Sequence, residues 1–424
     1  MSKAPNKISG SPTQGLFGAT TAFFIGLASV ALFGPTAKSL AQQLHLNAVS
    51  LGFLMGIPAL SGALLRIPFG AWVESTGGKL PNLILLGGAF CGITGLALTI
   101  SHPTFWTLAL FGAIAGFGVA TFSVSMGQVS YWFSKAKQGT ANGIYGGVGN
   151  LSPGIASLWI PIALGLYGAQ NTYWLWLVYL AVGIGLYAIF GKNSPYFQLI
   201  KQGVSAEDAK ALARQAGQEL FPSSTALQSL KTTARYWQTW VLVVIYHTTF
   251  GGFLALTAWF PNYWQTMFGL KLFPEAVGLT AIFSIGASLM RVVGGILSDR
   301  LGGVKTAFGS LAILFLGALL MIFGGRDFSV VFTGVCLIAV GMGVNNAATF
   351  KILPSVIPSA MGGASGWVGG LGALGGFLFP ILQGFFIKNP QVADPGYNFS
   401  FLVYALAAVL SVLFLLLLTR KAKA

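Results

Sequence analysis

Apolar residues occur along the chain in long runs, each bounded by short polar stretches or by glycine and proline. The runs cover residues 15–37, 49–73, 82–101, 104–132, 138–165, 170–191, 237–261, 274–298, 305–323, 328–350, 359–387 and 397–419. A helix of about 20 apolar residues is long enough to cross the hydrocarbon core of a bilayer. The pattern therefore predicts twelve membrane-spanning helices and an all-α integral membrane protein.

One long polar stretch interrupts this pattern and divides the apolar runs six and six. We expect a six-helix bundle over residues 1–191, a cytoplasmic linker over 192–236 and a second six-helix bundle over 237–424. Within the linker, Ser205 is followed three residues later by Asp208, a spacing typical of a helix N-terminus. We expect a short helix to begin there.

Composition agrees with a membrane protein, because 55% of the 424 residues are hydrophobic and only 7% are charged. A soluble domain is about 25% charged. Cys91 and Cys336 are the only cysteines, and both lie within apolar runs, so we expect them to be small core residues. The sequence offers neither a disulfide framework nor a CxxC metal site, and we expect no metal and no cofactor.

The charges are unequal, with 23 Lys and Arg against 8 Asp and Glu. If the N-terminus is cytoplasmic, seventeen basic residues fall on the inner side and four in outer loops, as the positive-inside rule requires. We therefore expect both termini to be cytoplasmic and the protein to lie in the inner (cytoplasmic) membrane. The basic residues do not form a patch with interleaved aromatic residues, so nucleic acid is not an expected partner.

The two halves of the chain repeat each other. One set of residues recurs at an offset of 225, and a glycine-rich set recurs at an offset of 223. The first set comprises Arg66, Gly70, Glu74, Gly77 and Gly78 with Arg291, Gly295, Asp299, Gly302 and Gly303; the second includes Gly146 and Gly147 with Gly369 and Gly370. Six helices separate equivalent spans, so the repeats are parallel. Two such bundles are suited to alternating access around a site near the bilayer midplane.

The repeat places Arg66 and Arg291 at equivalent depths, about 12 Å from the cytoplasmic acid of each span at 1.5 Å per residue. An arginine at the bilayer centre costs at least about 2.5 to 3.5 kcal/mol. All eight acidic residues fall at helix ends or in loops, so none is available as a partner at that depth. This pattern favours an anion from outside over arginines that are satisfied by helix carbonyls.

Guanidinium groups offer a planar fork of donors, which suits a small planar oxyanion such as nitrate, nitrite, formate or oxalate. Two fixed positive charges repel each other when the cavity closes empty, which favours obligatory exchange of one anion for another. Proton symport would need a carboxylate or histidine in the membrane, and His247 is the one candidate. The three histidines are scattered, so an intramembrane enzyme is not expected.

Two long signatures carry a family resemblance. The first is GFGVATFSVSMGQVSYWF over residues 116–133, continued by GTANGIYGGVGN over 139–150. The second is GMGVNNAATFK over 341–351, followed by GGASGWVGGLGALGGFLFP over 362–380. With GALLR over 62–66 and DRLGG over 299–303, the chain resembles the nitrate/nitrite porters of the major facilitator superfamily. The resemblance implies two pseudosymmetric six-helix bundles and transport of nitrate or nitrite.

The same resemblance implies which residues bind the anion. Arg66 and Arg291 would hold it from either side, Asn150 would supply a polar side chain, and Tyr246 would position an arginine or the substrate. Phe122 and Phe250 match aromatic residues that sandwich the planar ion. Gly146 and Gly369 would form bare backbone walls, although close helix packing is the alternative for such glycines.

The sequence also departs from the family pattern. Glu74 and Ser75 replace the usual Asp-Arg pair at the cytoplasmic end of the second span, whereas Asp299 and Arg300 keep it in the eighth. We expect Glu74, Asp299 and Arg300 to act at a cytoplasmic gate. The doublet Asn345 and Asn346 replaces a single asparagine, so Asn346 joins His247 as a further candidate for the site. We expect the transporter to be a monomer.

Overall fold

The computed structural model describes residues 8–134, 137–222, 225–357, 361–390 and 392–421, and within these ranges the regular structure is entirely helical. The helices of the first half are α1 (Pro12–Ala28), α2 (Phe33–Gln43), α3 (Ala48–Thr76), α4 (Lys79–Thr99), α5 (Phe105–Ala115), η1 (Gly116–Ala120), α6 (Thr121–Ser130) and α7 (Gln138–Phe190). Three short helices follow: α8 (Pro195–Lys201), α9 (Ala206–Gln215) and α10 (Ala226–Ala234). The remainder are α11 (Trp237–Tyr246), η2 (His247–Gly251), α12 (Gly252–Met267), η3 (Leu272–Ala276), α13 (Val277–Leu301), α14 (Gly303–Phe323), α15 (Phe328–Val356), α16 (Met361–Ala373), α17 (Gly375–Gly384), α18 (Gly396–Phe399) and α19 (Leu402–Lys421).

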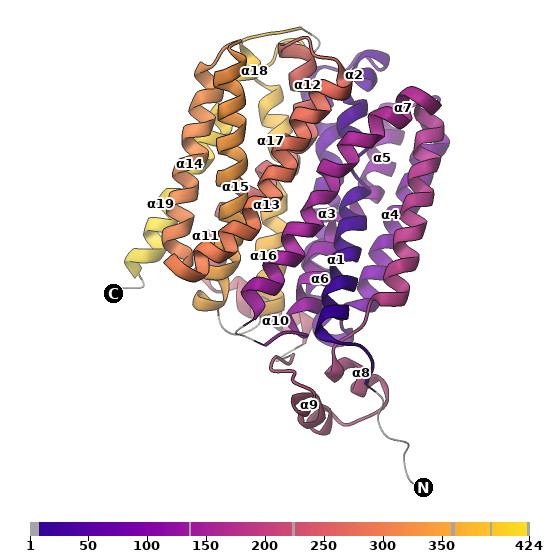
Figure 1. Ribbon diagram of the computed structural model, residues 1–424, viewed down its shortest axis with the longest axis vertical. Helices are drawn as coiled ribbons and strands as arrows, with labels where there is room; N and C mark the ends of the chain where they lie inside the picture. Colours follow the sequence, from indigo (N-terminus) through magenta and orange to yellow (C-terminus); the bar gives the residue numbers. More distant parts are fainter. Residues whose placement is uncertain (1–7, 135–136, 223–224, 358–360, 391, 422–424) are drawn as a thin grey trace.

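Eleven helical segments of the described chain are long and apolar enough to cross a membrane. One of them, residues 140–190 within α7, has 51 residues and is too long for a single crossing. At Gly168 the backbone takes a φ of 74° and a ψ of 173°, which breaks the helix, and α7 reverses direction there (Figure 1). This segment therefore supplies two spans, and the predicted twelve-span, all-α membrane fold is confirmed. Residues 359 and 360, at the start of the eleventh predicted run, lie outside the described residues.

The spans form two groups that lie side by side (Figure 1). Helices α1 to α7 form one group, and helices α11 to α19 form the other. Two seams join them, because α3 packs along α16 and α17 while α7 packs along α13. The start of α1, the end of α19 and the helices α8 to α10 all lie at one end of the molecule, which we call the linker end.

The sequence repeat has a structural counterpart at the linker end. Helix α3 stops at Gly77 with a φ of 73°, and helix α13 stops at the equivalent Gly302 with a φ of 88°. Glycine is favoured in this backbone region because it has no Cβ atom. The same residue type thus ends the same span in both halves.

The linker contains the helix that the sequence predicts. Ser205 is the N-cap of α9, and its Oγ accepts a hydrogen bond from the backbone N–H of Asp208 at 3.2 Å. Helix α10 lies against α16 and α3, where the two groups of spans meet. There the backbone N–H of Gly363 donates to Ser229 Oγ at 2.9 Å, and Trp367 Nε1 donates to the carbonyl of Leu230 at 3.1 Å. The linker is therefore attached to the span surface at this seam.

One expectation about the cysteines is wrong. Cys91 is exposed on the protein surface and Cys336 is half-buried, so neither is a fully buried core residue. Both lie within long apolar stretches of their helices, α4 and α15. In a membrane protein, apolar residues face lipid as well as the protein core, so an apolar neighbourhood in sequence does not predict burial.

Close packing of α4 against α5 leads to a prediction about Gly92. A Cβ atom at this position would lie 2.1 Å from the backbone N of Ala115, whereas a Cβ atom at Gly87 on the same helix meets nothing within 4 Å. We expect Gly92→Val to lower the free energy of unfolding by about 1 to 3 kcal/mol or more, because backbone atoms must move. Thermal denaturation of the purified protein in detergent tests this. The matched control Gly87→Val should melt close to wild type, and equal melting temperatures for the two variants would contradict the packing.

Candidate functional site

Helix α3 places Arg66 at the seam between the two groups of spans. The side chain is fully buried, at 0% exposure. Its Nε donates to the carbonyl of Val119 at 3.0 Å, and its Nη1 donates to the carbonyl of Gly369 at 2.8 Å. Nη2 has no hydrogen-bond partner among the described residues. Arg66 is thus held by both halves of the protein, with one pair of N–H donors left over.

Helix α13 places Arg291 on the other seam, and 2% of this residue is exposed. Its Nη1 donates to the hydroxyl of Tyr246 at 3.4 Å. A Cβ atom at Gly146 of α7 would lie 2.7 Å from Nε of Arg291, so the guanidinium group rests against bare backbone of the opposite half. Any larger residue at position 146 would displace this arginine.

Aromatic rings connect the two arginines. Phe122 lies with its ring centroid 4.7 Å from Cζ of Arg66 and 5.4 Å from Cζ of Arg291. Phe250 lies 4.8 Å from Cζ of Arg66 and stacks on Tyr246 at 4.9 Å with an interplanar angle of 5°. Because one ring is close to both guanidinium carbons, the repeat-related arginines belong to a single site.

The two phenylalanines lie on one of the arginines. The rings of Phe122 and Phe250 both face the guanidinium group of Arg66, and their sandwiching of the ion stays a prediction. A cation over an aromatic face is stabilised by about 0.5 to 2 kcal/mol, depending on its desolvation. The rings therefore compensate part of the burial of Arg66.

Neither arginine has a carboxylate partner. All eight acidic residues lie in the described part of the chain, where the one ion pair joins Lys351 to Asp299. Two guanidinium groups thus share a buried site with backbone carbonyls, a tyrosine hydroxyl and aromatic rings. Buried positive charges without a counterion are costly, and their N–H groups are strong donors for an anionic acceptor.

The remaining candidates lie at different distances from the arginines. Asn150 is 2% exposed, its side-chain Oδ1 has no partner, and its carbonyl accepts from Ser288 Oγ at 2.9 Å, one turn from Arg291. Asn346 Oδ1 accepts from Thr249 Oγ1 at 2.9 Å, in the π-helical turn η2 that also carries Phe250. Both asparagines therefore adjoin elements of the site.

His247 points elsewhere. Its Nδ1 lies 3.3 Å from the carbonyl of Leu371, and its ring packs against Phe379 at 5.2 Å. These contacts attach α11 and η2 to α16 and α17. Such contacts are typical of a histidine with a structural role. The structure does not bring the side chain of His247 together with the arginine pair.

Two residues of the site have no counterpart in the sequence prediction. Tyr145 donates its hydroxyl to the carbonyl of Phe122 at 2.7 Å, and Phe350 packs edge-on against Tyr246 at 5.0 Å and lies 5.9 Å from Cζ of Arg291. Tyr145 directly precedes Gly146, and Phe350 lies in the second signature. Those positions were a usable signal, but the chain has 12 Tyr and 34 Phe, and the residue type alone selects none of them.

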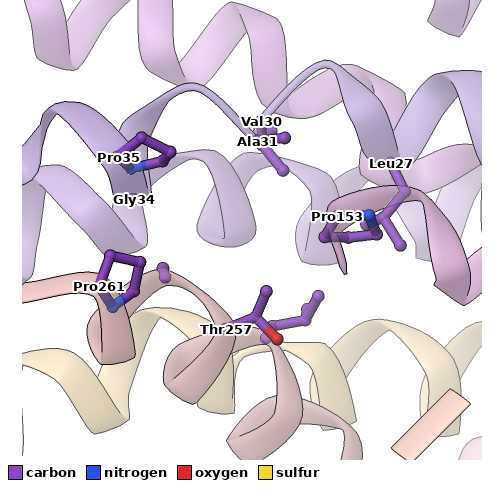
Figure 2. A pocket seen from close by; sticks show the side chains of 10 residues that line it. Leu27, Val30, Ala31, Gly34, Pro35, Pro153, Thr257 and Pro261 are labelled. Carbon is purple, nitrogen blue, oxygen red and sulfur yellow. The ribbon is translucent and has the colours of Figure 1, made fainter. Parts of the chain in front are cut away.

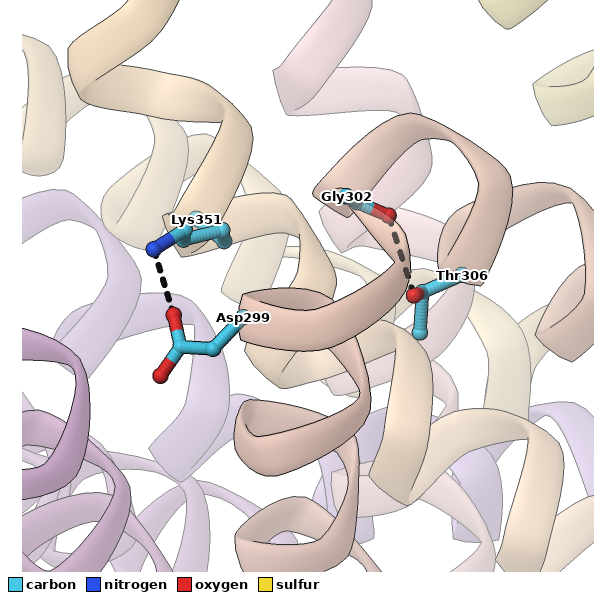
Figure 3. Close-up of polar contacts among 4 residues, drawn as sticks. All are labelled: Asp299, Gly302, Thr306 and Lys351. Atoms are coloured by element: carbon cyan, nitrogen blue, oxygen red, sulfur yellow. Dashed lines mark hydrogen bonds and ion pairs between the residues drawn. The ribbon is translucent and has the colours of Figure 1, made fainter.

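The expected gate residues lie at the linker end. Asp299 forms an ion pair with Lys351 of α15, and beside it Thr306 Oγ1 donates to the carbonyl of Gly302 at 3.0 Å (Figure 3). Asp299 and Lys351 are nearly half exposed, so the pair contributes little on its own. Glu74 is buried and accepts from the hydroxyl of Tyr131 at 2.9 Å. Arg300 is exposed, and no ion pair of its side chain is found among the described residues.

A separate pocket of about 50 Å³ lies between α12, Pro153 of α7, the end of α1 and the start of α2 (Figure 2). Its lining is almost wholly apolar and includes Pro35, Pro153 and Pro261, with Thr257 as the one polar side chain. An anion would lose its hydration there without gaining donors. This pocket therefore lacks the charged hydrogen-bond donors that the arginine pair supplies.

Comparisons with known proteins agree with this architecture. The sequence profile of the Major Facilitator Superfamily matches residues 19–281 and 274–424. Two solved structures share the fold at 15% sequence identity: the human organic anion transporter MFSD10, with a TM-score of 0.68 over 96% of this chain and 100% of that one, and the xylose transporter XylE from E. coli, with a TM-score of 0.69 over 96% and 98%.

Curated relatives are similar over most of the chain. The probable nitrate/nitrite antiporter NarK1 of Thermus thermophilus is 30% identical over 92% of this chain and 88% of its own length. The probable nitrate transporter NarT of Staphylococcus haemolyticus is 29% identical over 86% of both chains, and the nitrite extrusion protein of Bacillus subtilis is 28% identical over 83% and 81%. Twelve helical crossings in two halves, the superfamily profile and these relatives lead to one conclusion: this multi-pass membrane protein belongs to the major facilitator superfamily, in its nitrate/nitrite porter family.

Proposed function

We propose that the protein transports nitrate and nitrite across the inner (cytoplasmic) membrane and holds the anion between Arg66 and Arg291. The observation that carries this proposal is the burial of two guanidinium groups at one site without a carboxylate. The relatives named as nitrate and nitrite transporters support the substrate class. Formate and oxalate are the competing planar anions.

The donors around the arginines suit a small planar oxyanion. Nη2 of Arg66 has no partner, and Arg291 has one long hydrogen bond to Tyr246, so N–H groups on both sides are available to oxygen atoms. Phe122 and Phe250 supply apolar faces beside them. A weakly hydrated anion loses little hydration free energy on entering such a site and gains charge-assisted hydrogen bonds. Asn150, Gly146 and Gly369 complete the walls in this proposal.

The site suits alternating access because each arginine touches the opposite half. Arg66 of α3 donates to the carbonyl of Gly369 on α16, and Arg291 of α13 rests on Gly146 of α7. An anion bound between them would draw the halves together. We propose that residues 1–191 and 237–424 move as two units joined by the linker 192–236, with cytoplasmic termini and a gate at Glu74, Asp299 and Arg300. We further propose that one chain suffices for transport.

The two positive charges of Arg66 and Arg291 favour exchange of one anion for another. With the cavity empty, two positive charges would approach each other in a medium of low dielectric constant when the halves close. Bound nitrate or nitrite neutralises part of this repulsion, so the loaded carrier would switch more readily than the empty one. Proton symport is the alternative, and His247 would have to carry the proton although it contacts Leu371 and Phe379.

A first prediction concerns the shape of the arginine side chain. Arg66→Lys and Arg291→Lys keep the positive charge but remove the planar fork, so we expect nitrate transport to fall by at least tenfold in each. Uptake of labelled nitrate into nitrite-loaded proteoliposomes measures this. The control Arg214→Lys changes an exposed arginine of the linker helix α9 and should transport normally. Near-normal uptake in both site variants would remove the assignment of the arginines.

A second prediction concerns coupling. We expect vesicles loaded with nitrite or nitrate to take up labelled nitrate rapidly and empty vesicles to take up little, with or without an inward proton gradient. Accumulation in empty vesicles driven by the proton gradient alone would instead support symport. Unlabelled nitrite should compete with labelled nitrate more strongly than formate or oxalate does, and the reverse order would assign an organic anion.

A further inference from the structure

We propose that the hydroxyl group of Ser123 is a further anion contact, which donates to an oxygen of the substrate beside Arg66. This inference rests on the proposed function, because it adds a contact to the same anion. Ser123 belongs to α6 and is 1% exposed, yet its Oγ has no hydrogen-bond partner among the described residues. A buried hydroxyl without a partner loses its hydration free energy without compensation.

The missing partner has a local explanation. Serine and threonine in a helix commonly donate to the carbonyl four residues earlier, as Thr94 does to Phe90 at 2.9 Å and Thr257 does to Phe253 at 2.7 Å. For Ser123 that carbonyl belongs to Val119, and it already accepts Nε of Arg66 at 3.0 Å. The arginine thus occupies the usual acceptor of this serine.

Arg66 and Ser123 both adjoin Gly369. Nη1 of Arg66 donates to the carbonyl of Gly369, while Nη2 of the same arginine has no partner. A Cβ atom at Gly369 would lie 3.1 Å from Ser123 Oγ, so the hydroxyl adjoins the same residue. The guanidinium group of Arg66 and the hydroxyl of Ser123 thus lie beside one glycine, and each has a donor without an acceptor for an anionic oxygen.

Glycines from both halves surround Ser123. A Cβ atom at Gly70 of α3 would lie 3.0 Å from Cβ of Ser123 and 3.6 Å from Cα of Gly366 on α16. The glycines Gly70, Gly366 and Gly369 thus line the seam around the hydroxyl, from both halves of the protein. Ser123 lies one turn closer to the linker end than Val119, so it would contact the anion from the linker side.

Kinetics of Ser123→Ala and Ser123→Cys test this inference. Alanine removes the hydroxyl, and cysteine keeps a side chain of similar size with a much weaker donor. We expect both variants to raise the KM for nitrate exchange about tenfold with little change in maximal rate, as for loss of a hydrogen bond to a charged group. The control Ser29→Ala removes another fully buried serine hydroxyl, which already has backbone carbonyl acceptors at Gly26 and Ala115, and should keep the wild-type KM.

The outcomes separate this inference from the proposed function. Wild-type exchange of nitrate together with an unchanged KM in both Ser123 variants would overturn the inference alone. A fall in maximal rate and melting temperature at unchanged KM would assign Ser123 a structural role and would also overturn it. Absence of nitrate and nitrite exchange in the wild-type protein would overturn the proposed function itself, and the inference with it.

Discussion

The structure depends on one electrostatic constraint: two guanidinium groups are buried at one site, and no carboxylate neutralises them. Guanidinium groups do not deprotonate to escape burial. Their environment therefore has to compensate the lost hydration with carbonyls at Val119 and Gly369, a tyrosine hydroxyl and aromatic rings. This compensation is incomplete, because one N–H pair of Arg66 has no acceptor. In our account, a bound anion supplies the acceptor that this N–H pair lacks.

The same constraint links substrate binding to the movement of the halves. Arg66 and Arg291 come from opposite halves, and each is packed against the backbone of the other half at a glycine. Bare backbone at Gly146 and Gly369 lets the charged groups approach the seam closely. Any change in the position of one half therefore changes the distance between the two positive charges. An anion between the two charges would lower the free energy of the closed arrangement relative to the same arrangement with an empty cavity.

Much of the fold could be predicted from the sequence, because hydrophobic length and the internal repeat are local or periodic signals. The spans, the N-cap at Ser205 and the pairing of Arg66 with Arg291 at one site agree with the structure. The details of the site depend on tertiary contacts that have no local signature. Tyr145 and Phe350 are ordinary aromatic residues until neighbouring helices bring them to the arginines. The exposure of Cys91 was also beyond prediction, since lipid-facing and core-facing positions are equally apolar.

The most direct test of the account is a pair of crystal structures of the protein, one grown without nitrate and one saturated with it. The account predicts new difference density between the guanidinium groups of Arg66 and Arg291, with nitrate oxygens about 2.7 to 2.9 Å from guanidinium nitrogens. An ordered nitrate bound elsewhere in the membrane-spanning region, with the space between the two arginines unchanged at saturation, would contradict it.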